Sequence, residues 1–275
     1  MVAVVADSAA NLPGDMAREL GIEVVPMYLN FGDRVYRDGI DLSPQGFYHR
    51  LRRDRTLAST SAPSPGDFLE AYRRTGQDEI VCVTVAARLS ATHHQARLAA
   101  ESFEGRVEVV DSGSASMGEG FAALEAARRS ASGASADEVA DRAREVAERA
   151  LLLAAIDTFD FLQKSGRVTG LQAFAATTLG VKPVFSFRRG EPRPVARVRT
   201  RKRAIERIVQ DSLEEIGNRP VHLAVIHADA EMEALSIARG IAGRADVVES
   251  LTAEATPVIG AHTGPGLVGA AFYCD

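Results

Sequence analysis

Short apolar runs alternate along this chain with stretches in which apolar residues recur at helical spacing. The runs are strand-sized and rich in β-branched residues, and they read VAVVAD, IEVVPMYLNF, EIVCVTVAA, VEVVDS, LLLAAID, VHLAVIHA, DVVES and TPVIGAH. Strands that alternate with helices in this way are typical of βαβ units. The pattern therefore predicts an α/β fold with a largely parallel sheet.

Two helices have starts that can be read from the sequence. Ser64 precedes Pro65 and Asp67, which places a capping residue, a first-turn proline and an early acid ahead of FLEAYRR. Ser135 and Glu138 make a capping box before VADRAREVAERA. We expect this second helix to end near residue 150.

The same region marks a predicted domain boundary. Residues 128–139 are polar and rich in small side chains, and beyond residue 150 the pattern changes. There VKPVFSFRRGEPRPVARVRT predicts two strands joined by a turn at Gly190. We therefore predict an N-terminal domain over residues 1–150 and a C-terminal domain with a mixed sheet over residues 151–275, a division that suits a chain of 275 residues.

Composition narrows the class of protein. The chain is 46% apolar and 25% charged, as globular proteins are, and it shows neither a basic leader nor an apolar stretch of membrane-spanning length. Without such a stretch we expect a soluble protein that has no integral membrane segment. Two cysteines indicate no disulfide framework, which fits a reducing compartment, so we expect the protein to be cytoplasmic. The net charge of -5 argues against nucleic-acid binding, although residues 188–207 are strongly basic.

Small polar residues follow three of the predicted strands, where a doubly wound sheet binds its ligands. These residues are Asp7 and Ser8 after the first run, Ser90 and Thr92 after the third, and Asp111 and Ser112 after the fourth. Hydroxyls and helix-start amides suit an anion such as a carboxylate or phosphate. Each of these serines could instead simply cap a helix. Thr60 and Ser61 lie just before the capped helix that follows Ser64, and they belong either to the same site or to a cap and turn.

The glycines of AHTGPGLVG match the dinucleotide pattern G-x-G-x-x-G, at Gly264, Gly266 and Gly269. A dinucleotide site needs a following helix, a second strand and an acidic residue, and only six residues follow Gly269. We expect instead that these glycines let the backbone pass close to a ligand or another strand. His262 is then expected at the end of the strand TPVIGAH, on a tight turn, with a structural role as the alternative.

No histidine pair has metal-binding spacing. His93 and His94 are adjacent and point apart on a helix, and His222 and His227 face opposite sides of a strand. We therefore predict no metal site and no cofactor.

Nine motifs together resemble, in order and spacing, the DegV family, whose studied members are the fatty-acid-binding subunits of bacterial fatty acid kinase. They are VVADSAANLP, YRDGIDLSPQGFY, STSAPSPGDFLEAY, LSATHHQA, VVDSGSASMGEG, FLQKSGRV, LGVKPVFSF, RVRTRKRA and VIGAHTGPGLVG, and they cover nearly the whole chain. The resemblance implies an N-terminal α/β/α domain, a C-terminal α/β domain, and a long-chain fatty acid between them. It also implies a separate ATP-binding kinase subunit that forms an acyl phosphate.

The resemblance assigns roles to individual residues. It implies that Thr60, Ser61, Ser90, Thr92, His262 and Gly264 bind the ligand, that His262 and Arg167 act in catalysis, and that Arg199 and Arg201 face the kinase subunit. Three positions depart from the family pattern: Ala6 stands in place of a threonine, and Ala91 and Ser165 each stand in place of a glycine. Ala6 removes one hydroxyl that the family has near the headgroup, and the other expected hydroxyls, of Thr60, Ser61 and Ser90, are present.

Two further features bear on this function. Small side chains in LQAFAATTLG, residues 171–180, leave room along a cavity or belong to an alanine-rich core helix. Arg193, Arg197, Arg199 and Arg201 alternate onto one face of a predicted strand, which would dock an acidic partner or nucleotide phosphates, or would protect a solvated edge.

Two other functions stay open at this point. A binding protein for a different anionic molecule would use the same polar rim. A hydrolase would use Ser90 or Ser8 with His262 and an acid such as Asp111, although the chain contains no G-x-S-x-G elbow.

Overall fold

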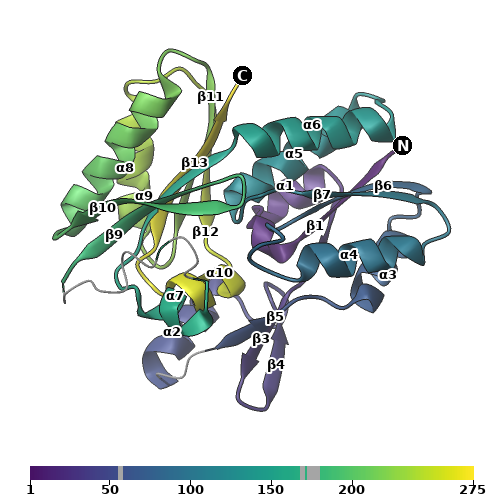
Figure 1. The fold of residues 1–275 in the computed structure, drawn as a ribbon, viewed down its shortest axis with the longest axis horizontal. Helices are drawn as coiled ribbons and strands as arrows, with labels where there is room; N and C mark the ends of the chain where they lie inside the picture. The colour runs from purple at the N-terminus through teal and green to yellow at the C-terminus, as the bar shows by residue number, and fades with distance from the viewer. Residues whose placement is uncertain (55–57, 168–170, 172–179) are drawn as a thin grey trace.

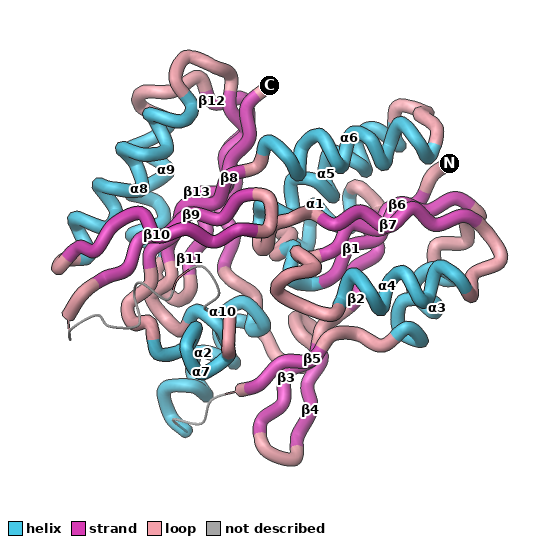
Figure 2. Tube along the Cα trace, viewed as in Figure 1, coloured by secondary structure: helices cyan, strands magenta, loops and turns pink. Residues whose placement is uncertain are grey.

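The computed structural model describes residues 1–54, 58–167, 171 and 180–275 (Figure 1). It contains two large sheets flanked by helices, and a small third sheet that projects beside them (Figure 2). The fold is mixed α/β, with one parallel and one mixed sheet, as the sequence predicts. The division into two domains at residue 150 stays a prediction, because the largest cluster of buried side chains joins residues of both large sheets.

The first large sheet is parallel throughout and has the strand order β2-β1-β6-β7. Its strands are β1 (Ala3–Asp7), β2 (Ile22–Val25), β6 (Glu79–Thr84) and β7 (Arg106–Asp111). Its helices are η1 (Ser8–Ala10), α1 (Gly14–Glu19), α3 (Pro65–Arg74), α4 (Thr92–Glu101), α5 (Met117–Ala131) and α6 (Ala136–Arg149). Helices α3 and α4 cover one face and α5 and α6 the other, which confirms the α/β/α layering (Figure 1).

The second large sheet has the order β10-β9-β8-β13-β11-β12, and among its described strands only the β11–β12 pairing is parallel. Its strands are β8 (Leu151–Ala155), β9 (Lys182–Arg188), β10 (Glu191–Val198), β11 (Val221–His227), β12 (Val247–Glu254) and β13 (Val268–Cys274). Its helices are α7 (Asp160–Ser165), α8 (Arg201–Ile216), α9 (Glu231–Ala242) and α10 (Pro257–Thr263). Helices α8 and α9 pack on one face, and the opposite face turns toward α5 and the first sheet.

The run IEVVPMYLNF forms two strands in two different sheets, so the prediction of one strand was wrong. Residues 26 and 27 break the run, and the proline there lacks the N–H that a continuous ladder needs. Beyond the break lies the antiparallel sheet β4-β3-β5 with helix α2 nearby (Figure 1). Its elements are β3 (Tyr28–Phe31), β4 (Arg34–Arg37), α2 (Pro44–Asp54) and β5 (Ser59–Ser61).

Local capping signals in the sequence are confirmed. Ser64 with Asp67, and Ser135 with Glu138, each form a reciprocal capping box at the start of α3 and α6. The hairpin of β9 and β10 turns at Gly190, also as predicted. These features rest on bonds between residues close in sequence, so the sequence alone determines them.

The predicted arginine face does not form. Strand β10 ends at Val198, and a bulge between Pro194 and Ala196 breaks the alternation of its side chains. Arg199 is exposed in the turn that follows, and Arg201 begins α8. Arg199 and Arg201, the two arginines expected at a kinase surface, therefore both lie outside the strand, one in an exposed turn and the other at the start of a helix.

Candidate functional site

A cavity lies between the two large sheets and opens to solvent at one side. Apolar side chains from β8, β9 and β11 form much of its wall, among them Leu152, Ala154, Phe185, Phe187 and Ile226. Strand alternation explains this wall, because Leu152 and Ala154 face the cavity while the residues between and after them join the core under α8 and α9. An apolar wall of this kind suits an apolar ligand.

Polar groups gather at one part of this cavity. Thr60, Ser90, Arg167 and His262 all line it. Thr60 Oγ1 and His262 Nε2 form a hydrogen bond of 2.9 Å, and the Nδ1 atom of His262 has no partner among the described residues. The structure thus brings together residues that lie 202 positions apart in sequence.

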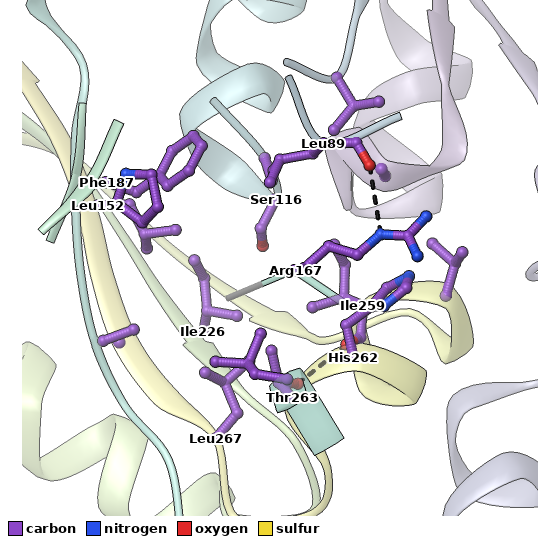
Figure 3. Close-up of a pocket in the computed structure, with 18 of the residues that line it drawn as sticks. Leu89, Ser116, Leu152, Arg167, Phe187, Ile226, Ile259, His262, Thr263 and Leu267 are labelled. Atoms are coloured by element: carbon purple, nitrogen blue, oxygen red, sulfur yellow. Dashed lines mark hydrogen bonds between the residues drawn. The ribbon is translucent and has the colours of Figure 1, made fainter. Parts of the chain in front are cut away.

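Backbone carbonyls fix the guanidinium of Arg167. Its Nε donates to the carbonyl of Leu89 (3.3 Å) and its Nη1 to the carbonyl of Ser165 (2.6 Å). Figure 3 shows the Arg167 side chain beside the imidazole of His262. A positive charge held here favours an anionic ligand at this end of the cavity.

His262 lies on helix α10, so the prediction of a strand ending at a tight turn was wrong. Contacts with the first half of the chain hold this short helix. Asn11 Oδ1 accepts from the Thr256 amide (2.7 Å), and Asp38 Oδ1 accepts from the Val258 amide (3.1 Å). The Thr256 side chain itself makes no capping bond, so the helix takes its N-terminal partners from elsewhere in the fold.

Burial, and after it the nearby charge of Arg167, lowers the pKa of His262 to about 4. The imidazole is therefore neutral at physiological pH in the free protein. A neutral imidazole that bonds Thr60 through Nε2 can still donate or accept a proton through its second nitrogen.

Replacing His262 with glutamine should change how stability depends on pH. The unfolded chain binds a proton at this histidine near pH 6.5 and the folded protein only near pH 4, so the wild type loses stability as pH falls through that window. The free energy of unfolding falls by about 3 kcal/mol in total once the pH is below the folded-state pKa. His262→Gln should therefore gain stability relative to the wild type between pH 7 and pH 4.5 in urea unfolding. His94→Gln, at an exposed position, is the matched control, and curves for wild type and His262→Gln that stay parallel would contradict this expectation.

Other residues expected at the ligand lie near the cavity without lining it. Ser61 is exposed on the opposite side of β5 from Thr60, because neighbouring strand residues face opposite ways. Thr92 is buried, and its Oγ1 bonds the hydroxyl of Ser90 (2.7 Å). Gly264 ends α10 with a φ of 74° and presses against the ring of Phe161. Their ligand-binding roles stay predictions.

The predicted polar rim exists, and its members differ in their contacts. Strands β1, β6 and β7 are neighbours and parallel, so their carboxyl ends meet at one edge. Ser8 donates to Asp38 (2.7 Å) and Ser112 to the carbonyl of Ser114 (3.3 Å), both in buried positions. Of the three rim serines, Ser90 is the one that lines the cavity.

Asp7 at the same rim is a buried structural acid. Its carboxylate accepts from the amides of Ala9 (2.9 Å) and Val85 (2.8 Å), both of which line the cavity. Burial raises the pKa of Asp7 to about 6, and it raises the pKa of the neighbouring Glu119 well above its usual value. Sequence reasoning placed Asp7 at the rim and missed both Glu119 and Asp38.

The glycine motif leads into strand β13, which the sequence analysis did not identify. A Cβ on Gly269 would lie 2.7 Å from the carbonyl of Leu153, so β13 passes close to β8 there. Gly266 takes a φ of 83° and leaves no room for a Cβ beside Asp157. These close contacts confirm the expectation of close backbone approach. The motif also runs into a strand, where a dinucleotide site requires a helix.

The remaining predicted positions have varied surroundings. Arg201 bonds the Gly266 carbonyl and lies 3.3 Å from Asp157, while Arg199 is exposed. Leu171 lines the cavity, whereas residues 172–179 of the predicted small-residue segment lie outside the described residues.

Across the described part of the chain, no group of His, Cys, Asp and Glu has the arrangement of a metal site. None of the described helices has the length and apolar character to cross a membrane.

Comparisons with known proteins cover the entire chain. The family model described as an uncharacterised protein of the DegV family matches residues 1–275. A DegV domain-containing protein from Streptomyces coelicolor is 37% identical over 272 residues, which are 98% of this chain and 96% of that relative. Protein DegV from Bacillus subtilis is 33% identical, over 98% of this chain and 97% of that protein.

Solved structures match equally well. A fatty-acid-binding DegV family protein from Thermus thermophilus superposes with a TM-score of 0.93 at 31% identity, over 100% of this chain and 99% of that one. DegV from Bacillus subtilis, a fatty acid binding protein, gives a TM-score of 0.90 at 30% identity, with 100% and 99% covered. The family match over the full length, together with these relatives, establishes that the chain belongs to the DegV family.

Proposed function

We propose that this protein binds a long-chain fatty acid in the cavity between its two large sheets and presents the carboxylate to a separate ATP-binding kinase subunit. That subunit would transfer a phosphoryl group from ATP to the carboxylate and so form an acyl phosphate. The present chain would carry the substrate and would have no kinase activity alone. The observation that supports this most directly is the joining of an apolar cavity to the group formed by Thr60, Ser90, Arg167 and His262.

The energetics of binding suit an amphiphile. Burying about 14 methylenes at roughly 0.8 kcal/mol each contributes on the order of 11 kcal/mol before the entropy of ordering the tail is subtracted. A buried carboxylate without partners would cost several kcal/mol, so it needs fixed donors. Arg167 and the hydroxyls of Thr60 and Ser90 are donors of that kind. The tail therefore supplies affinity and the polar group sets the position of the head.

Relatives support the same ligand class. The Thermus thermophilus and Bacillus subtilis structures are both of fatty-acid-binding proteins, and they cover the whole of this chain. In the proposal, His262 and Arg167 act at the carboxylate during phosphoryl transfer. A neutral His262 leaves the nucleophilic carboxylate oxygen unprotonated, and Arg167 offsets the negative charge that gathers as phosphate approaches.

Native mass spectrometry of the purified protein tests the binding step. A co-purifying mass in the fatty acid range, removed by delipidation and restored by adding a fatty acid, supports the proposal. A polar anion in its place would indicate a binding protein for another small molecule. Turnover of a chromogenic ester would indicate a hydrolase. The geometry does not favour that function, because the Ser90 hydroxyl pairs with Thr92 while His262 Nε2 pairs with Thr60.

Reversing Arg199 to glutamate should weaken coupling to the kinase subunit without emptying the cavity. Arg199 is exposed in the turn before α8, outside the residues that line the cavity. A kinase surface of complementary charge would lose attraction, and we expect a fall of about tenfold in the rate of acyl phosphate formation. Arg73→Glu, exposed on α3, is the matched control. Equal rates for Arg199→Glu and wild type would remove this arginine from the kinase surface.

A further inference from the structure

Ser116 places a polar atom without a partner in the apolar part of the cavity wall. The residue is 3% exposed and lines the cavity, and its hydroxyl has no hydrogen bond among the described residues. Figure 3 shows the hydroxyl directed into the space bordered by Leu152, Phe187 and Ile226. Buried polar atoms normally have partners, so this hydroxyl is suited to a partner that comes with the ligand.

The backbone at Ser116 is strained in a way that glycine would relieve. Its φ is 54° and its ψ is -145°, a region that residues with a Cβ rarely occupy. The amide of Ser116 holds this conformation by donating to the Ala9 carbonyl (2.7 Å). A side chain at this position costs stability, which points to a function for the hydroxyl.

Helix capping does not account for that hydroxyl. Ser116 stands at the N-cap position of α5, and its side chain accepts no bond from the helix amides. Ser64 and Ser135 at the same position of α3 and α6 both make that bond. The Ser116 hydroxyl is turned into the cavity instead of toward its own helix.

The charge around Ser116 restricts the ligand group to a neutral one. The guanidinium of Arg167 extends away from it toward the Leu89 carbonyl, as Figure 3 shows. A second carboxylate beside Ser116 would be buried among apolar side chains without a counter-charge. A hydroxyl or keto oxygen needs no counter-charge and would satisfy the serine with one hydrogen bond.

We propose that Ser116 recognises an oxygen atom carried on the acyl chain, so that the site prefers hydroxy or keto fatty acids over plain saturated ones. This inference rests on the proposed fatty acid binding and names the substrate class more closely. The carboxylate would occupy the polar group around Thr60 and His262, and the chain oxygen would pair with Ser116. A plain methylene at that place leaves the hydroxyl unsatisfied, which is the source of the preference.

Competition binding tests the proposal with stearic acid and a series of hydroxystearic acids that differ in the position of the hydroxyl. On the delipidated wild type, at least one hydroxystearic acid should bind about tenfold more tightly than stearic acid. Ser116→Ala should remove that preference and leave the affinity for stearic acid unchanged or higher. Ser116→Gly should do the same while unfolding at the same or higher urea concentration than wild type, because glycine tolerates the backbone.

Ser114→Ala is the matched control. Its hydroxyl is also buried and unpartnered among the described residues, but it does not line the cavity, so the variant should keep the preference. Equal affinities of wild type for stearic acid and for every member of the series would overturn the inference, as would an equal loss for both acids in Ser116→Ala. If stearic acid and all its derivatives fail to bind wild type, the proposed fatty acid binding itself fails.

Discussion

Replacing Ala154 with phenylalanine is expected to abolish fatty acid binding while the protein stays folded. Ala154 lies on β8 and faces the cavity, where a phenyl group would occupy the space that the acyl chain needs. Losing burial for about half of the methylenes would lower affinity by at least about 100-fold. The cavity beside Ala154 gives the ring a space to enter. Displacement of a fluorescent fatty acid measures the loss.

Leu152→Met is the control on the same strand and the same face. Its side chain keeps nearly the volume of leucine, so fatty acid affinity should change little. Circular dichroism and urea unfolding establish that both variants fold. Full affinity in a folded Ala154→Phe protein would show that the chain binds elsewhere, and the proposed function would then lose its principal support.

The strands and capped helices were predictable because their determinants are local. Ser64 with Asp67, and Ser135 with Glu138, bond over three residues, and the β-branched runs identify most strands of the two large sheets. Helix α10 was not predictable in this way. Val258 and Ile259 favour a strand, and the helix depends on Asn11 and Asp38, which are distant in sequence. Tertiary contacts decided the local conformation.

The candidate site also has parts that the sequence predicted and parts that it did not. The resemblance to a family named Thr60, Ser90, Arg167 and His262, and the fold brings them to one cavity. The cavity was beyond sequence reasoning, because its walls come from strands of one sheet and loops of another. Ser116 was missed for a related reason: its motif VVDSGSASMGEG indicates a glycine-rich turn, and the positive φ that turns its hydroxyl inward depends on the Ala9 carbonyl.

Asp38 connects the first half of the chain to the helix that carries His262. Its side chain is 2% exposed and accepts two bonds, from the Ser8 hydroxyl and from the Val258 amide. Ser8 in turn accepts from the amide of Met27 (3.0 Å). Since Met27 and Val258 both line the cavity, this buried carboxyl holds two parts of its wall in place.

Asp38→Ala should therefore destabilise the protein by about 3–5 kcal/mol, because it leaves the Ser8 hydroxyl and the Val258 amide buried without acceptors. The loosened α10 should also weaken fatty acid binding. Asp38→Asn keeps an oxygen for Val258 and should lose less. Asp41→Ala removes only exposed bonds, from the Arg37 guanidinium and the Arg37 amide on the same segment, and is the control. Urea unfolding measures all three, and equal stabilities of Asp38→Ala and Asp41→Ala would contradict a structural link from Asp38 to the site.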